Sequence, residues 1–520
     1  MNDFDVAIVG FGPSGAVAAC LLGQAGLRVL VVEKQTEVWP KPRAIAIDHE
    51  ILRLFQNIGV SEQVLPHTEP FTASQHFGVD GQLIRHVDMV PAPYPLSYVP
   101  SMVFTQPPVE AALRAHAAAY PTVEIVLGAA FAGLQQDADS VTLTLTQDGA
   151  TRNIRAGYVI GCDGASSPVR QCVGIALKDL VFDEPWLVVD VKVNEAGLAK
   201  LPTTAAQFCE PARPSTFIVG PGNHRRWEIM LQPDEDPREM EQDEALWRLL
   251  SRWITPEDGT LWRASSYRFH ALVAEEWRRG RVFIAGDAAH QQPPFLGQGM
   301  CQGIRDVANL SWKLIAVLAG DATDALLDTY GAERGQHVTT LTSRIKAIGH
   351  AICERDPDAA RARDAKLIAD SCGRAPHVTR QEIVPPLETG LLAQDAHPAC
   401  GTLFPQPWVW DGDGRQRMDE RAGTGWRMVL DGRARPEIGG GPRHITVHQP
   451  GDQCGTEHPG EWVEQDGVLA RWFDRHGCIG AIVRPDHYVF GALTAANADT
   501  LLADWRSWTG SVVSGRHDDA

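Results

Sequence analysis

The stretch that most restricts the fold lies at the start of the chain, where a glycine-rich turn separates two apolar segments. Residues 6–9 form a continuous apolar run, which is typical of a strand buried on both faces of a sheet. A GxGxxG turn follows at residues 10–15, and residues 16–22 then read as a helix built from small residues. A second apolar run over residues 29–32 ends at Glu33. This order of elements predicts a Rossmann-like α/β fold that binds a dinucleotide.

Each glycine of this turn has a separate task in the predicted fold. Gly10 permits the tight turn, Gly12 lets the backbone approach a pyrophosphate, and Gly15 lets the helix pack on the sheet. Glu33 follows Gly15 by 18 residues, where a carboxylate is expected to meet a ribose 2′-hydroxyl. A carboxylate there disfavours a 2′-phosphate, so the motif predicts NAD or FAD without separating the two.

Two later turns have the same outline. Residues 158–170 read as a strand that ends in Asp163-Gly164, and residues 282–285 read as a strand that ends in Gly286-Asp287. Prolines, glycines and a helix-like stretch follow the second of these turns. The chain therefore binds either two nucleotides or opposite ends of one.

Composition narrows the class of protein. The chain has 520 residues, which is enough for roughly three domains. Its formal charge of −18 disfavours nucleic acid or an anionic membrane as a partner. No apolar run approaches the ~20 residues of a membrane-spanning helix, and the acidic start is unlike a signal peptide. The ten cysteines show no CxxC spacing, so we expect neither a metal site nor disulfides, and a cytoplasmic location.

The order and spacing of the three turns resemble those of the single-component FAD-dependent aromatic hydroxylases. The resemblance covers roughly residues 3–345. It implies that the first turn binds the ADP half of FAD and that the GD turn meets the ribityl side, so both turns hold one extended cofactor. It also implies NADH or NADPH as the electron donor, which visits the flavin transiently because the chain has no second GxGxxG fold.

The resemblance assigns FAD contacts residue by residue. The residues so implied lie in the three turns, after the second strand, and beside the expected isoalloxazine ring. They are Gly10, Gly12, Pro13, Ser14, Gly15, Glu33, Lys34, Arg43, Ala44, Gln106, Asp163, Gly286, Asp287, Pro293, Pro294, Gly297, Gln298, Gly299 and Met300.

Between the DG and GD turns, segments with partial apolar alternation predict a sheet with one covered face. Residues 42–48, 209–214, 225–228 and 267–271 resemble the branch typified by 3-(3-hydroxyphenyl)propionate hydroxylase. That branch implies a phenolic acid as substrate, hydroxylated ortho to the existing hydroxyl through a flavin C4a-hydroperoxide, with consumption of O2. The same fold also serves epoxidases, Baeyer–Villiger enzymes and flavin-dependent halogenases, and a flavin scaffold without turnover is a further alternative.

A base that removes the phenol proton would help this chemistry, because a phenolate is richer in electrons than a phenol. Asp48, His49 and His270 are the candidates. The alternative for the first two is structural, with Asp48 as the N-cap of a helix that His49 opens. His270 has the alternative of an ordinary sheet residue.

A substrate carboxylate would suit an arginine, since a guanidinium binds it through two hydrogen bonds. Arg213, Arg225 and Arg268 are the candidates, and solvated arginines at a sheet edge are the alternative.

The remaining sequence resembles the thioredoxin-like tail of phenol-hydroxylase-type members. Its three cysteines, Cys400, Cys454 and Cys478, are far apart and form no CxxC pair, so we expect a packing role or support for a homodimer. The expected domains are FAD-binding (1–75, 104–178, 275–345), substrate sheet (76–103, 179–274), helical connector (346–395) and thioredoxin-like (396–520).

Overall fold

The first glycine turn follows the central strand of a mixed sheet, here named the parallel sheet. The computed structural model describes residues 2–509 except 411–413, 435–437 and 452–459. In spatial order the main strands of the parallel sheet are β17 (Arg278–Arg279), β18 (Val282–Ile284), β11 (Ala150–Gly161), β1 (Phe4–Val9), β2 (Val29–Glu33) and β8 (Val123–Leu127). The antiparallel strands β10 (Val141–Gln147) and β9 (Ala130–Gln136) extend it from β11.

Apolar sequence explains why this sheet is central. Strands β1, β2 and β18 are almost wholly buried, as their continuous apolar runs predict. The helices α1 (Pro13–Gln24), α4 (Gln106–Ala118) and α9 (Gly299–Leu318) cover the sheet, and α1 packs against both of the others. The Rossmann-like expectation is confirmed by this arrangement, with all three glycine turns at the same edge of the sheet.

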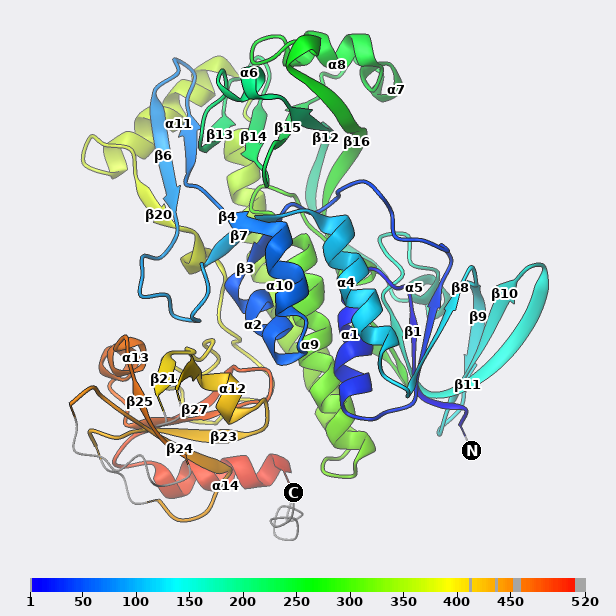
Figure 1. Cartoon of the computed structure of the whole chain (residues 1–520), viewed down its shortest axis with the longest axis vertical. Helices are drawn as coiled ribbons and strands as arrows, with labels where there is room; N and C mark the ends of the chain where they lie inside the picture. Colours follow the sequence, from blue (N-terminus) through cyan, green and yellow to red (C-terminus); the bar gives the residue numbers. More distant parts are fainter. Residues whose placement is uncertain (1, 411–413, 435–437, 452–459, 510–520) are drawn as a thin grey trace.

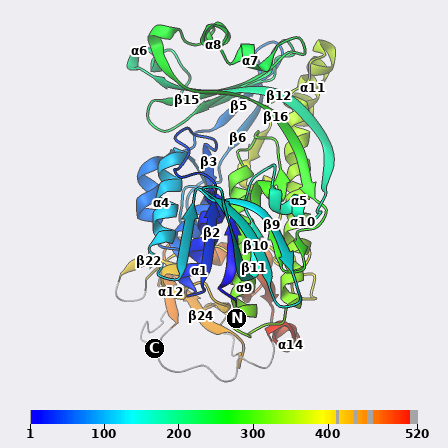
Figure 2. The ribbon, with the colours of Figure 1, turned by 90° about the vertical axis from the view of Figure 1, so that its right-hand side faces the viewer.

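A larger sheet stands above that edge (Figures 1 and 2). We call it the substrate sheet. Its strands, in spatial order, are β19 (His290–Gln291), β16 (Gly259–Ala274), β12 (Leu177–Val193), β15 (His224–Met230), β14 (Ser215–Val219), β13 (Ala205–Phe208), β5 (Ser74–Phe77), β6 (Leu83–Asp88) and β20 (His377–Thr379).

The outer face of the substrate sheet is apolar and covered. Leu246 and Leu250 of α8 (Asp243–Leu250) belong to one buried cluster with Phe217 and Trp227. The alternate residues of the same strands turn inward, toward the parallel sheet. The sheet therefore presents its polar residues to the interior of the molecule.

The expected domain limits and the observed strands differ in two places. The segment 346–395, expected to be a helical connector and linker, contains the end of α10 (Ala325–Ile352), α11 (Pro357–Asp370) and the edge strand β20. The segment 76–103 is divided between two sheets, because β7 (Ser101–Phe104) pairs with β3 (Ala46–Asp48) and β4 (Thr68–Pro70) instead of joining the substrate sheet.

The C-terminal part has its own seven-stranded sheet (Figure 1). In spatial order the strands are β22 (Arg415–Arg417), β21 (Trp408–Trp410), β25 (Glu461–Glu464), β24 (Arg443–His448), β23 (Arg427–Asp431), β26 (Gly480–Val483) and β27 (Val489–Leu493). Strands β23, β24 and β25 run parallel, whereas β26 and β27 are antiparallel. Helices α12 (Met418–Ala422), α13 (Val468–His476) and α14 (Ala498–Thr509) complete this part.

The sheet makes the C-terminal segment a separate α/β unit, and its thioredoxin-like class stays a prediction. Cys454 lies outside the described residues, while Cys400 and Cys478 are free thiols.

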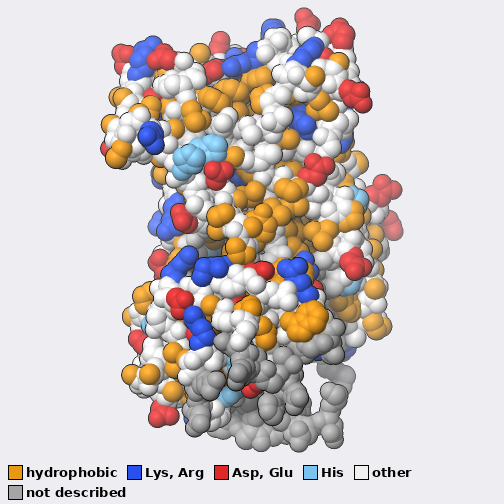
Figure 3. All heavy atoms as spheres, turned by 60° about the vertical axis from the view of Figure 1, so that its left-hand side comes forward, with side chains coloured by type: hydrophobic (Ala, Val, Ile, Leu, Met, Phe, Trp, Pro, Cys, Tyr) orange, Lys and Arg blue, Asp and Glu red, His pale blue; other side chains and the backbone are white. Residues whose placement is uncertain are grey.

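No helix within the described ranges is both long and apolar enough to cross a membrane. On the face drawn in Figure 3, acidic and basic side chains are scattered among apolar ones.

Candidate active site

One cavity of about 430 Å³ lies between the glycine turns and the inner face of the substrate sheet. Its lower wall contains residues that the sequence assigns to FAD. These are Gly12, Pro13, Ser14, Arg43, Ala44, Gln106, Gly286, Asp287, Pro294, Gly297, Gly299 and Met300. The fold therefore brings together segments that are nearly three hundred residues apart in the chain.

The other residues assigned to FAD do not line this cavity. They are Gly10, Gly15, Glu33, Lys34, Asp163, Pro293 and Gln298. Glu33 accepts hydrogen bonds from the backbone N–H groups of Phe11 and Gln35, each at 2.8 Å, and so orders the first turn. Asp163 accepts from the Ser167 hydroxyl at 2.5 Å and from the Val169 N–H at 2.9 Å. Both carboxylates hold a turn in shape, and their contact with FAD stays a prediction.

Gln106 fixes the loop that carries Arg43. Its side-chain oxygen accepts from the backbone N–H groups of Arg43 at 3.0 Å and Ala44 at 2.6 Å. Its amide nitrogen donates to Glu110 at 3.1 Å, which sets the orientation of the amide. The Arg43 guanidinium is left exposed at the cavity, where it can meet a negatively charged ligand.

A buried ion network holds the GD turn. Asp306 on α9 accepts from the backbone N–H of Gly286 at 2.9 Å, from His290 at 2.7 Å and from Arg334 at 2.8 Å. Burial raises the pKa of this carboxyl, but His290 and Arg334 outweigh burial and hold it below its usual range. The network leaves Asp287 free to face the cavity.

The part of the lower wall around Gly12 has the space and the backbone groups that a dinucleotide requires. A Cβ atom added at Gly12 meets no atom within 4 Å, whereas one added at Gly15 would lie 2.0 Å from the Gly10 carbonyl oxygen. Gly12 is also the residue before the first turn of α1, whose free N–H groups and dipole favour a phosphate. The open space at Gly12, at the start of the helix, is therefore where a pyrophosphate of FAD would lie.

The upper wall combines aromatic, aliphatic and polar side chains. Phe71, Phe269 and Phe295 line it together with Val188 and Ile218. Such a surface suits a flat, apolar ring. The polar residues of the same wall are Gln207, Thr216, Arg226, Glu228, Arg263, Tyr267 and Arg380.

Arg226 and Arg263 both donate hydrogen bonds to one buried carboxylate, that of Asp190. Arg226 donates to Asp190 at 2.7 and 3.2 Å, and Arg263 does so at 3.4 Å. Arg263 also donates to the Tyr267 hydroxyl. Burial raises the pKa of Asp190, but Arg226 and His224 lower it more, to about 2. Asp190 is therefore ionised and holds both guanidinium groups in place.

The three arginines expected to bind a substrate carboxylate all lie outside this cavity. Arg213 is paired with Glu235 at 2.8 Å, and Arg268 is paired with Asp183 at 2.7 Å. Arg225 donates to backbone carbonyl oxygens of the neighbouring turn. The reason is the alternation of strand residues, because Arg225 and Arg268 are sequence neighbours of cavity residues and so point to the opposite face.

The three candidate bases also lie outside the cavity lining. Asp48 caps the helix α2 (His49–Asn57), as the structural alternative predicts, and its second oxygen pairs with Arg305 at 2.5 Å. His49 is buried, and burial lowers its pKa to about 4. His270 lies 3.6 Å from a surface carboxylate, on the outward side of β16. The geometry does not support a catalytic role for any of them.

Four charged residues of the cavity, Arg226, Glu228, Arg263 and Arg380, were not among the predicted site residues. Glu228 lies in a stretch that reads as an alternating strand and that carries part of the resemblance to the hydroxylase branch, and Arg380 lies in the expected connector. The alternation of Arg226 and Glu228 with apolar residues was a usable signal, since it places two charges on one covered face. No local signal marks Arg380, which reaches the cavity only because β20 joins the substrate sheet.

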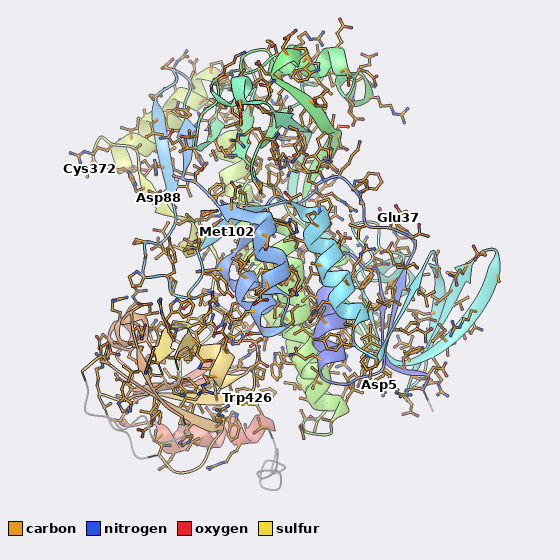
Figure 4. All side chains as sticks on the ribbon, viewed as in Figure 1. Asp5, Glu37, Asp88, Met102, Cys372 and Trp426 are labelled. Atoms are coloured by element: carbon orange, nitrogen blue, oxygen red, sulfur yellow. The ribbon has the colours of Figure 1, made fainter. Side chains whose placement is uncertain are left out.

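A second, larger cavity of about 1010 Å³ lies between α1, α9 and the C-terminal part. Trp312, Trp426 and Trp505 line it, and Figure 4 labels Trp426 in the C-terminal part. None of the residues assigned to FAD lines this cavity. It is therefore separate from the candidate active site.

Three residues that could ligate a metal meet at an edge of the substrate sheet, although the sequence predicts no metal site. His86 and Asp88 on β6 lie beside His377 on β20, with one ligand atom of each within 4.8 Å of the others. Figure 4 labels Asp88 on this edge strand. The group is partly exposed and lies outside the cavity.

Comparison with known proteins defines the class. A family model described as "FAD binding domain" matches residues 3–345, and one described as "HcaD C-terminal domain" matches residues 401–507. Since the first match covers most of the chain and agrees with the cavity, the chain belongs to this FAD-binding family. FAD as cofactor and the mixed α/β fold are thereby confirmed.

Similar proteins that match over nearly the whole chain are named hydroxylases, so the chain belongs to the FAD-dependent aromatic hydroxylases. The chain is 38% identical over 506 residues to a probable NADH-specific resorcinol 4-hydroxylase of Rhodococcus jostii (strain RHA1), covering 94% of this chain and 91% of that protein. It is 34% identical over 521 residues to a 3-(3-hydroxy-phenyl)propionate/3-hydroxycinnamic acid hydroxylase of Mycobacterium sp. (strain JLS), covering 96% and 90%.

Solved structures share the fold. The flavin-dependent monooxygenase PieE, in complex with FAD and substrate, matches with a TM-score of 0.81 at 22% identity, covering 98% of this chain and 99% of that one. Aklavinone-11 hydroxylase with FAD and aklavinone matches with a TM-score of 0.75 at 24% identity, covering 97% and 99%.

Proposed function

We propose that this enzyme hydroxylates a phenolic aromatic acid ortho to its existing hydroxyl group, using NADH and O2. Bound FAD would supply the activated oxygen, held by the glycine turns and the loop at Arg43. The names of the similar hydroxylases support hydroxylation over epoxidation, Baeyer–Villiger oxidation, halogenation or a scaffold role. The name of the Rhodococcus relative supports NADH as the donor.

The observation that carries the proposal is the lining of the cavity between the glycine turns and the substrate sheet. Its lower wall is built from the FAD-assigned residues, and its upper wall is an aromatic surface with a few polar groups. A ring bound against Phe269 and Phe295 would therefore lie between the substrate sheet and the loop at Pro294 and Gly297. The chain's own residues would bind the ring, orient it and exclude water, which is the protein's part in cofactor chemistry.

Arg380 supports an acid group on the substrate. Its guanidinium donates to the Leu296 carbonyl oxygen and lies 4.9 Å from the centre of the Phe71 ring. Among the described residues no carboxylate pairs with it, unlike Arg226 and Arg263. Burial lowers its pKa, so an incoming carboxylate would relieve an unfavourable buried charge.

Resorcinol is the second candidate substrate, favoured by the name of the Rhodococcus relative. Resorcinol has no carboxylate, so Arg380 would have no direct partner in that complex. The two candidates therefore differ in their predicted dependence on Arg380.

The test compares purified yellow protein with its Arg380→Met and Arg380→Lys variants. We expect 3-(3-hydroxyphenyl)propionate to stimulate NADH oxidation, to give a catechol product, and to show a KM about 10- to 100-fold higher in Arg380→Met, since a charge-assisted pair contributes about 1.5–3 kcal/mol. Arg380→Lys, which keeps the charge, should lose less. Stimulation by resorcinol alone, unchanged in Arg380→Met, would favour the second candidate and contradict the acid.

A further inference from the structure

Glu228 is a buried carboxylate in the middle of the substrate sheet. It lies on β15 and is 4% exposed. Its in-register neighbours are Val188 on β12 and Thr216 on β14, and both line the cavity as Glu228 does. The side chain therefore belongs to the inner face of the sheet and turns toward the space where a substrate ring would lie.

Within the part of the chain that the structure describes, no donor is hydrogen-bonded to the Glu228 carboxylate and no cation lies within 4 Å of it. The nearest basic side chains of the sheet are otherwise engaged, because Arg226 and Arg263 donate to Asp190. The Tyr267 hydroxyl accepts a hydrogen bond from Arg263. A buried carboxylate without a donor is costly, so proteins seldom keep one without a ligand or a reaction that uses it.

Glu228 and the other carboxylate of the cavity, Asp287, lie in opposite walls. Asp287 belongs to the GD turn in the lower wall, where FAD is expected. Among the described residues, Glu228 is the one carboxylate in the upper wall. Glu228 lacks a hydrogen-bond donor within the protein, and the hydroxyl group of a phenolic substrate would supply one.

We propose that Glu228 accepts the proton of the substrate's existing phenolic hydroxyl group, which makes it the catalytic base of the upper wall. This inference rests on the proposed function. In the step, the substrate O–H bond breaks, the proton bonds to a Glu228 oxygen, and the electron pair stays on the phenolate oxygen. The phenolate then carries more electron density at the ortho carbon, which is the atom to be hydroxylated.

The charges around Glu228 set the pH at which it can act. Burial raises its pKa to about 7; Arg226 on the same strand and Arg263 on β16 lower the pKa, whereas Asp190 on β12 raises it. The carboxylate form that accepts a proton therefore predominates only above about pH 7. Hydroxylation should increase as the pH rises through this value, because the protonated acid cannot serve as a base.

The test uses Glu228→Gln, which keeps the size and removes the charge, with Glu228→Asp as a second variant. Glu210→Gln is the matched control, because Glu210 pairs with Arg252 at the surface and lies outside the cavity. We expect Glu228→Gln to keep its FAD while its rate of product formation falls about 100-fold and loses the rise near pH 7. Glu228→Asp should keep the pH dependence at a reduced rate, and Glu210→Gln should match the wild type.

A second measurement separates a base from a merely structural residue. A ring-fluorinated phenol gives up its proton more easily, so the loss caused by Glu228→Gln should be several-fold smaller with that substrate. If Glu228→Gln retains the wild-type rate and pH profile, or loses the same factor with both substrates, the proposed base is overturned. If the wild type forms no hydroxylated product from any phenol, the proposed function fails instead.

Discussion

At the scale of single residues, two glycines of one turn serve different ends. Gly15 is required by packing, because an added Cβ atom would lie 2.0 Å from the Gly10 carbonyl oxygen. Gly12 has open space beside it and the extended backbone that other residues adopt. Gly15 therefore maintains the fold, and Gly12 leaves room for the cofactor.

Substitutions at Gly12 and Gly15 should therefore have different effects, one on FAD binding and the other on stability. Gly12→Val should fold with an almost unchanged apoprotein melting temperature and lose most of its FAD, because the side chain fills the cradle. Gly15→Ala should cost about 1–3 kcal/mol in the free energy of unfolding, as overpacking does. Differential scanning fluorimetry and the flavin absorbance of the purified proteins measure both effects. A Gly12→Val protein that stays fully yellow would contradict the location of the pyrophosphate.

Glu228 predicts a pH-dependent stability. Its folded pKa is raised, to about 7 from 4.5, so the folded protein holds a proton that the unfolded chain releases between these values. Ionised Glu228 therefore destabilises the fold, and stability is lost as the pH rises from about 4.5 to 7. Relative to wild type, Glu228→Gln should gain roughly 3 kcal/mol across this window, from ~1.4 kcal/mol per pKa unit. Urea unfolding of the apoproteins at pH 5 and pH 8 tests this, and a constant difference would contradict it.

At the scale of elements, one carboxylate joins two helices to the GD turn. Asp306 on α9 binds the Gly286 backbone and His290 of the turn, and it pairs with Arg334 on α10. All of these groups are buried. The turn that faces the cofactor is thus held by the helices behind it.

Asp306→Asn should loosen this connection. Arg334 would remain buried without its carboxylate, which costs about 3–5 kcal/mol in the free energy of unfolding. FAD should also dissociate faster, because a neutral amide with one acceptor oxygen holds the Gly286 N–H and His290 less firmly than the carboxylate does. Asp328→Asn is the control, since Asp328 pairs with Arg278 at the surface and should cost about 1 kcal/mol or less. Equal losses in the two variants would argue against the network.

The same scale shows what the sequence could predict. The glycine turns are local patterns, so residues 10–15 and the GD turn identified the parallel sheet and most of the lower wall. The upper wall depends on which strand face turns inward and on a strand from beyond α11. The sequence predicts Arg225 as a substrate-binding residue, but its neighbour Arg226 lines the cavity. Tertiary packing decides which face of a strand turns inward, and here α8 covers the outer face. Arg380 depends entirely on the pairing of β20 with β6.

At the scale of the whole molecule, the C-terminal part is tied to the FAD-binding part by buried ion pairs. Arg53 on α2 donates to Asp419 on α12 at 2.5 and 2.9 Å and to the Phe404 carbonyl oxygen at 2.5 Å. On the other side, Arg484 pairs with Glu333 on α10 at 2.7 Å. Lys313 and Arg484 together hold the pKa of Glu333 at about 2 although burial raises it. The two parts are therefore expected to unfold together.

Arg53→Met tests this coupling. It leaves Asp419 buried without its main cation and should cost about 3–5 kcal/mol. The double variant Arg53→Met with Asp419→Leu should recover part of that loss, because no carboxylate is left without its main cation, while Arg427, 3.5 Å from Asp419, loses its partner. Calorimetry should show one transition for the wild type, and a separate early transition of the C-terminal part in the wild type would contradict the coupling.

The central claim is that this chain inserts one atom of O2 into a phenolic ring at the cost of NADH. The most direct test incubates the yellow protein with NADH, ¹⁸O2 and 3-(3-hydroxyphenyl)propionate, and measures the mass and substitution pattern of the product. We predict one ¹⁸O atom per product molecule, placed ortho to the original hydroxyl. Unlabelled product, or NADH oxidation that yields only hydrogen peroxide with every phenol tried, would contradict the account.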